Sequence, residues 1–198
     1  MQDLADHFNA NKKPEWSGLQ CHQGNVVGCW WLGRWYNTSR DATGNYFYGA
    51  YPKGFLPRVE LLFGEQFALG VILHLCSGTL QGDGQRVITL DINPALQPNV
   101  VGNAEEVDKI WNKPTFDLIL VDPPYENNHL KYGTKKISRK KVITVCSKII
   151  KPGGYLAWLD TLIPQWSKTD WEYKGLIGVA QSTNHRMRGL LILRAKEN

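Results

Sequence analysis

Asp122, Pro123, Pro124 and Tyr125 follow directly after the apolar run Phe116–Val121. Such a short run of branched side chains predicts a buried strand. The chain therefore places a carboxylate, two prolines and an aromatic ring at a strand's carboxyl end, the edge where open α/β sheets bind ligands. Because the prolines fix φ and remove two amide donors, we expect a stiff loop that presents acceptors to a planar amine. The alternative is a strand followed by a surface turn.

The chemistry that these residues suit is transfer of a group to an aromatic amine. If Asp122 and the carbonyl of Pro123 accept the two N–H hydrogens, the nitrogen lone pair can point at an electrophile, and each bond to the charged acceptor contributes ~1.5–3 kcal/mol. The tetrapeptide resembles the D-P-P-Y motif of class I S-adenosylmethionine-dependent methyltransferases that methylate amino groups of nucleic-acid bases. The resemblance implies S-adenosyl-L-methionine as cofactor, catalytic roles for Asp122, Pro123 and Tyr125, and a cofactor contact for Asp122. Tyr125 would stack on the base, which needs a ring and not a hydroxyl.

Three loops that follow predicted strands stand where this family binds its cofactor. The predicted strand Val71–Leu75 leads into Cys76, Ser77 and Gly78. The strand Arg86–Leu90 leads into Asp91, and Val100–Val101 leads into Asn103 and Ala104. Nucleotide-binding sheets place the acceptor for ribose hydroxyls after the second strand. The resemblance therefore implies that these six residues contact the cofactor. The alternatives are purely structural: a strand-ending turn for Asp91 and a helix N-cap for Asn103.

The segment Tyr51–Pro57 resembles the family's segment that closes over the methionine part of the cofactor. Tyr51 and Lys53 are therefore candidate cofactor contacts, and a solvated lysine is the alternative. The chain departs from the family pattern at His74, where an acid is usual, and at Leu80, which replaces a glycine. The connection that follows is also too short for a crossover helix. These departures keep open a nucleic-acid binding module on a degenerate methyltransferase fold.

A basic segment follows the motif. Together with an arginine from a later turn, its candidate phosphate contacts are Lys131, Lys135, Lys136, Arg139, Lys140 and Arg186. The formal charge of +5 also suits a polyanionic partner. A solvated loop is the alternative. We expect a nucleic acid as the partner, DNA before RNA.

Alternating strands and helices from about residue 58 predict an α/β fold. We expect a Rossmann-like, seven-stranded and mainly parallel sheet with a closing antiparallel strand and helices on both faces. We expect residues 1–50 to form a tryptophan-rich N-terminal extension and residues 51–198 to form the catalytic domain. The other expected elements are a strand or hairpin at Val26–Tyr36, helices at Arg58–Phe67, Ala104–Trp111 and Arg139–Ile150, a turn at Lys151–Gly154, and strands at Tyr155–Leu159, Glu172–Gln181 and Met187–Arg194.

The sequence also predicts where the protein is located and which sites it lacks. The start has no basic region followed by an apolar one, and no stretch approaches the ~20 apolar residues of a membrane span. We therefore expect a cytoplasmic protein without a membrane partner. The four cysteines lack the spacing of a metal site, so we expect no metal. Oligomeric state cannot be read from the sequence.

Together these features predict methylation of an exocyclic amino group, with N6 of adenine in DNA as the favoured target. Only about thirty residues separate Asp91 from Asp122, which leaves no room for an inserted target-recognition region. This compactness keeps open a methyltransferase acting on adenine N6 or guanine N2 in RNA. Cytosine N4 in DNA is a further alternative, and a small-molecule methyltransferase is disfavoured by the motif and the basic segment.

Overall fold

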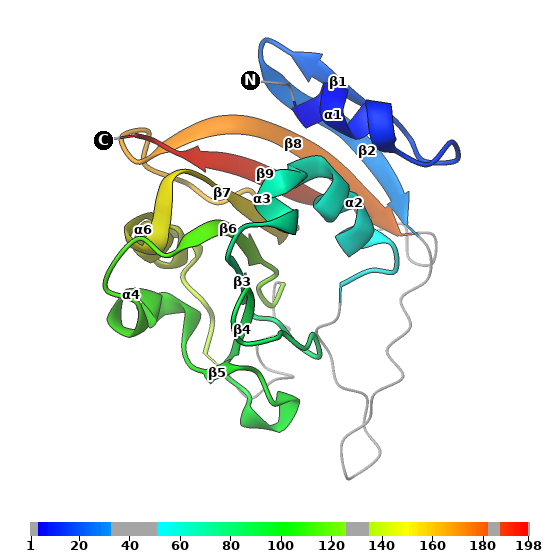
Figure 1. Ribbon diagram of the computed structural model, residues 1–198. Coiled ribbons are helices and arrows are strands. Elements are labelled where there is room, and N and C mark those ends of the chain that lie inside the picture. The colour runs from blue at the N-terminus through cyan, green and yellow to red at the C-terminus, as the bar shows by residue number, and fades with distance from the viewer. Residues whose placement is uncertain (1–3, 33–50, 126–134, 182–186, 198) are drawn as a thin grey trace.

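The computed structural model describes residues 4–32, 51–125, 135–181 and 187–197 (Figure 1). Within them, one sheet of nine strands has the order β1-β2-β8-β9-β7-β6-β3-β4-β5. The strands are β1 (Leu19–His22), β2 (Asn25–Leu32), β3 (Ile72–Leu75), β4 (Val87–Asp91), β5 (Val100–Val101), β6 (Phe116–Val121), β7 (Ile150–Asp160), β8 (Trp171–Gln181) and β9 (Met187–Ala195). The expected α/β sheet is thus confirmed.

The central strands β5, β4, β3, β6 and β7 are parallel to one another and follow the order 3-2-1-4-5 of a Rossmann-like sheet. Strand β9 lies between β7 and β8 and is antiparallel to both, which is the expected closing strand. The direction of strand order reverses between β3 and β6. In such sheets the ligand crevice lies at the carboxyl ends of the strands that flank this reversal.

The sheet is wider than the seven strands predicted. Strands β1 and β2 form a hairpin, and β2 pairs in parallel with β8 from Val26 opposite Gly175 to Leu32 opposite Gln181. The hairpin covers the edge of β8, whose backbone groups would otherwise lack partners. The expected Val26–Tyr36 strand thus corresponds to β2 as far as Leu32, and its remainder lies outside the described residues.

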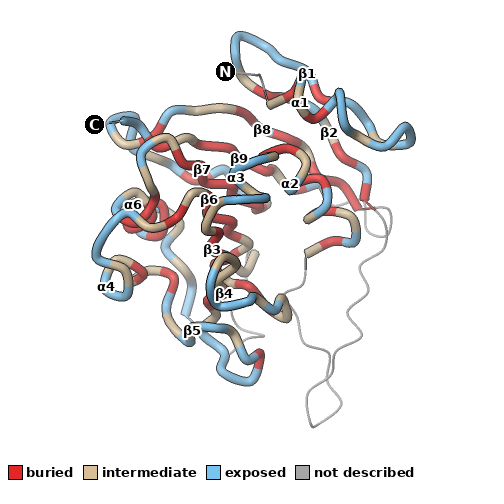
Figure 2. The backbone as a smooth tube through the Cα atoms, viewed as in Figure 1, coloured by how far each residue is buried: buried red, intermediate tan, exposed pale blue. Residues whose placement is uncertain are grey.

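Helices cover both faces of the sheet, as expected. One face packs against α1 (Leu4–Asn11) and α2 (Phe55–Phe63), and the short α3 (Glu65–Ala68) follows α2. The other face packs against α4 (Val107–Ile110) and α6 (Arg139–Ile149). Two single-turn 3-10 helices, η1 (Pro94–Leu96) and η2 (Ala104–Glu106), complete the described elements. Buried residues follow the strands and the inner sides of these helices (Figure 2).

Two predicted boundaries were wrong. The helix expected at Arg58–Phe67 begins at Phe55 and breaks at Gly64, which has φ 49° and ψ −114° and lies so close to His7 that a Cβ there would be 2.8 Å from Nε2. The turn expected at Lys151–Gly154 is instead part of strand β7, which begins at Ile150. The pairing of β7 with β6 is irregular at this end.

The helix predicted at Arg139–Ile150 agrees with α6 to within one residue. The Ser138 hydroxyl caps α6 by accepting from the Lys141 amide, at 3.4 Å. The predicted Ala104 helix is split into η2 and α4, with Asn103 as its cap. No helix joins β3 to β4. Among the described residues, no helix has the length and apolar character needed to cross a membrane.

Candidate active site at the carboxyl edge of the sheet

The carboxyl ends of three parallel strands bring together residues that the sequence singled out. In the register of the sheet, Leu75 of β3 lies opposite both Leu90 of β4 and Val121 of β6. The next residues along the chain are Cys76, Asp91 and Asp122. Because β3 and β6 flank the reversal of strand order, these residues lie at the edge of the sheet where such folds bind ligands.

Asp91 organises the loop after β3. Its Oδ2 accepts from the Gly78 amide at 3.0 Å, and its Oδ1 accepts from the Asn93 amide at 3.0 Å. Burial raises the pKa of Asp91, although these backbone hydrogen bonds act in the opposite direction. The Asp91 carboxylate therefore stabilises the turn that ends its strand, which was the structural alternative. Its position also suits a ligand hydroxyl.

The loop after β3 offers backbone and a hydroxyl to a ligand. Cys76 and Gly78 both have positive φ, 56° and 57°, and burial together with the charges of Asp91 and Asp122 raises the pKa of the Cys76 thiol. The Ser77 hydroxyl is buried, and none of the described residues forms a hydrogen bond with it. A buried polar atom without a partner is unfavourable, so this loop fits a polar ligand that would supply one.

Tyr51 lies beside His74 of β3. Its hydroxyl is 3.2 Å from Nδ1 of His74, and its ring stacks on Phe55 at 5.2 Å. Burial raises the pKa of Tyr51, and the charges of Asp122 and Cys76 raise it further, which places all three groups close together. His74 is 1% exposed, and burial lowers its pKa to about 4. A neutral imidazole therefore stands where an acid was expected from the family pattern. Lys53 is exposed in the loop before α2.

Asn103 and Ala104 lie just beyond β5, next to the β4 end. The Asn103 side chain accepts from the Glu105 amide at 2.9 Å, which is the N-cap role that the sequence raised as an alternative. Ala104 is buried in the core beside Val107. Both side chains thus have structural roles, and their cofactor contacts stay predictions.

In the loop after β6, the Asp122 carboxylate accepts a hydrogen bond from the Tyr125 hydroxyl. Arg188, from β9, donates to that hydroxyl from Nη1 at 3.0 Å, and its guanidinium lies 5.1 Å from the centre of the Tyr125 ring. Burial raises the pKa of Asp122 to about 7. The Arg188 cation and the Tyr125 hydroxyl oppose this shift, and the negative charge of Asp160 adds to it. Near neutral pH this carboxyl is thus divided between its two protonation states.

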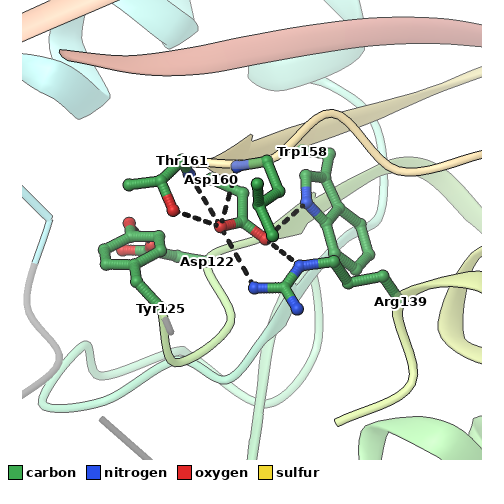
Figure 3. Close-up of polar contacts among 7 residues, drawn as sticks. Asp122, Tyr125, Arg139, Trp158, Asp160 and Thr161 are labelled. Carbon is green, nitrogen blue, oxygen red and sulfur yellow. Dashed lines mark hydrogen bonds and ion pairs between the residues drawn. The ribbon is translucent and has the colours of Figure 1, made fainter. Parts of the chain in front are cut away.

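Sequence reasoning missed Asp160, which ends β7 beside Asp122 (Figure 3). Asp160 is fully buried, and Arg139 binds it from Nε at 2.5 Å and from Nη2 at 3.4 Å. Further donors are the Trp158 indole at 3.3 Å, the Thr161 amide at 2.7 Å, the Thr161 hydroxyl at 3.3 Å and the Leu162 amide at 3.4 Å. The available signal was a carboxylate directly after an apolar strand, the same signal that identified Asp91 and Asp122.

The predicted phosphate contacts separate into different environments. Lys135, Lys136 and Lys140 are exposed. Arg139 differs from its prediction, because its side chain is only 14% exposed and is paired with Asp160. Lys131 and Arg186 lie outside the described residues. Among the residues that the structure describes, no group of three or more His, Cys, Asp or Glu is placed to hold a metal ion.

The chain matches no protein-family model and no curated protein sequence. It is similar in structure to yhhF from Escherichia coli, assigned as a methyltransferase, at 11% identity and a TM-score of 0.49, over 81% of this chain and 97% of that one. It is also similar to an rRNA methylase from Streptococcus thermophilus, at 12% identity and a TM-score of 0.39, over 64% of this chain and 87% of that one.

TrmN from Thermus thermophilus is similar at 14% identity and a TM-score of 0.42, over 69% of this chain and 48% of that one. Because every one of these TM-scores is below 0.5, the fold assignment rests on the strand order described above and not on these likenesses.

Proposed function

We propose that the chain is an S-adenosylmethionine-dependent methyltransferase that acts on an exocyclic amino group of a nucleic-acid base, with N6 of adenine in DNA as the favoured target. The observation that carries the proposal is the pairing of two half-sites across the β3–β6 reversal. Asp91 and the Cys76–Gly78 loop lie on one side, and Asp122, Pro123 and Tyr125 lie on the other.

The residues on the β3 and β4 side fit the proposed cofactor. Asp91 would accept from ribose hydroxyls, and the buried Ser77 hydroxyl and the backbone of Gly78 would meet the polar part of the same ligand. Tyr51 would lie beside the methionine part, with the neutral His74 in place of a second carboxylate. When bound, the cofactor supplies a methyl group that is already activated by its sulfonium, so no metal is required.

The residues on the β6 side orient the amine. The Asp122 carboxylate and the Pro123 carbonyl accept the two N–H hydrogens, which holds the nitrogen lone pair toward the methyl group. These bonds strengthen as positive charge develops on nitrogen, so they stabilise the transition state more than the bound substrate. Asp122 must be ionised for this role. Its pKa of about 7 predicts that activity falls as the pH drops below that value.

The compactness of the chain favours RNA as a second candidate substrate. The segment between Asp91 and Asp122 contains only β5, η2 and α4 besides its loops and β6, and no inserted unit that could read a DNA sequence. A base inside a duplex must also be flipped out at a cost of a few kcal/mol, which an unpaired base in RNA or in single-stranded DNA avoids.

The test is methyl transfer from labelled S-adenosylmethionine to duplex DNA, single-stranded DNA or RNA, followed by mass spectrometry of the nucleosides. Asp122→Ala should lower the rate at least about a hundredfold, which corresponds to ~2.7 kcal/mol of transition-state stabilisation. By calorimetry, its affinity for the demethylated cofactor should stay close to that of wild type, whereas Asp91→Ala should weaken binding. Methyl transfer by Asp122→Ala at the wild-type rate would contradict the proposal.

A further inference from the structure

Arg188 is a buried cation whose role the proposed chemistry leaves open. It is 7% exposed and lies on β9, opposite Val179 of β8. Its Nη1 donates to the Tyr125 hydroxyl at 3.0 Å, and its Cζ lies 5.1 Å from the centre of the Tyr125 ring. Burying a guanidinium costs free energy unless the group has a partner. The Tyr125 hydroxyl, which is bonded to the Asp122 carboxylate, is that partner for Arg188.

The hydrogen bonds at this point have a direction. Arg188 can only donate, so the Tyr125 oxygen accepts from it and the hydroxyl hydrogen goes to Oδ1 of Asp122. Among the described residues, no side chain donates to Oδ2 of Asp122. A carboxylate can accept about four hydrogen bonds, so the chain from Arg188 through Tyr125 leaves Oδ2 available to an incoming amine.

We propose that Arg188 is a positioning residue, which holds the Tyr125 ring and hydroxyl and thereby fixes the orientation of the Asp122 carboxylate. As far as it concerns catalysis, this inference rests on the proposed function. The Tyr125 hydroxyl then has a part of its own, which differs from the sequence-based expectation that only the ring matters. Tyr125→Phe keeps the ring but breaks the link between Arg188 and Asp122.

Arg188 also acts on Asp122 through its charge. The charged or titratable groups near Asp122 are Arg188 of β9, Tyr125 of its own loop, Asp160 of β7, Cys76 after β3 and Tyr51 before α2. Within this set, Arg188 is the cation. Burial and the negative charge of Asp160 raise the pKa of Asp122, and the positive charge of Arg188 lowers it. Removing Arg188 must therefore raise the pKa of Asp122.

The first measurement needs neither cofactor nor nucleic acid. The Asp122 carboxyl carbon is titrated by NMR in wild type, Arg188→Gln, Arg188→Lys and Arg194→Gln. A nearby opposite charge shifts a carboxyl pKa by ~1–3 units, so Arg188→Gln should raise the pKa of Asp122 by about one unit or more. Arg188→Lys keeps the charge and should shift it less. Arg194→Gln is the matched control, since Arg194 lies on the same strand but contacts Gly153 and Glu197 instead, and it should leave Asp122 unchanged.

The second measurement follows the rate of methyl transfer against pH. In Arg188→Gln the acid limb of the profile should move upward with the pKa of Asp122. In Arg188→Lys the limb should stay near its wild-type position while the maximal rate falls, because an ammonium cannot reproduce the planar contact with the ring. Tyr125→Phe should raise the pKa of Asp122 by removing a donor, and it supplies the test if Arg188→Gln does not fold.

An Asp122 pKa that is the same in wild type, Arg188→Gln and Tyr125→Phe would overturn the inference. If wild type transfers no methyl group to any nucleic acid, the proposed function fails, and the titration still decides whether Arg188 sets the state of Asp122.

Discussion

Asp122 and Asp160 lie at the carboxyl ends of two neighbouring parallel strands, but their surroundings differ. Asp160 is fully buried and receives hydrogen bonds from the Arg139 guanidinium, the Trp158 indole and three groups of the following two residues. Asp122 is partly exposed, and among the described residues its carboxylate accepts only from Tyr125. The difference separates a carboxylate that holds the structure together from one that keeps acceptor capacity for a ligand.

The largest expected effect comes from breaking the Asp160 pair. Asp160→Ala leaves the Arg139 guanidinium buried without its partner, which should lower the free energy of unfolding by about 3–5 kcal/mol. Urea unfolding followed by circular dichroism measures it. The control is Asp160→Leu combined with Arg139→Met, which should lose less than Asp160→Ala because no charge remains unpaired. Equal losses in the two variants would contradict a structural role for the pair.

Asp122→Asn should have the opposite effect on stability. The pKa of Asp122 is about 7 in the folded protein, against a value of 3.8 for an ordinary aspartate. The unfolded chain therefore loses this proton at lower pH than the folded one, and the carboxyl destabilises the fold increasingly from about pH 4 to pH 7. Because the group is partly exposed, we expect Asp122→Asn to stabilise by only about 1–2 kcal/mol at pH 8.

Thermal unfolding of wild type and Asp122→Asn at pH 4 and pH 8 measures this difference. The gain should be close to zero at pH 4 and should reach its full size above pH 7. A gain of the same size at both values would show that packing, and not ionisation, causes it. A stabilised variant that transfers no methyl group would mark Asp122 as a residue kept for chemistry at the expense of stability.

The smallest expected effect concerns the cations near the two strand ends. Arg139 is paired with Asp160, whereas Lys135 and Lys136 are exposed. If both lysines contact phosphates, Lys135→Ala with Lys136→Ala should reduce the slope of log affinity against log salt by about one unit for each contact. Lys168→Ala, at an exposed position before β8, is the control and should leave the slope unchanged. An unchanged slope in the double variant would assign these lysines to a solvated surface.

Local pattern predicted the fold more completely than the site. The central strands are short apolar runs, and the cap of α6 is a serine at the expected position, so neighbouring residues suffice to identify both. Neighbouring residues did not reveal the break at Gly64, where His7 of another helix approaches so closely that a Cβ would lie 2.8 Å from its Nε2. The pairing of β2 with β8 likewise depends on residues far apart in the chain.

The candidate site shows the same limit. Asp91 and Asp122 were identified because each follows an apolar strand, and the rule extends to Asp160 once β7 is known to reach it. Arg139 was interpreted as a phosphate contact because it lies in a run of basic residues, and nothing in that run indicates which cation points inward. The contact of Arg188 with Tyr125 joins residues 63 positions apart and follows only from the register of β9.

The pairing of β2 with β8 also constrains how the protein folds during synthesis. The β1–β2 hairpin leaves the ribosome early, but its partner strand ends at Gln181, near the other end of the chain. Until β8 has emerged, Trp30 and Leu32, which are buried in the finished sheet, have no strand to pack beside. Such late, long-range pairing slows folding and leaves an apolar edge open to other chains, so aggregation of nascent or truncated chains should depend on this hairpin.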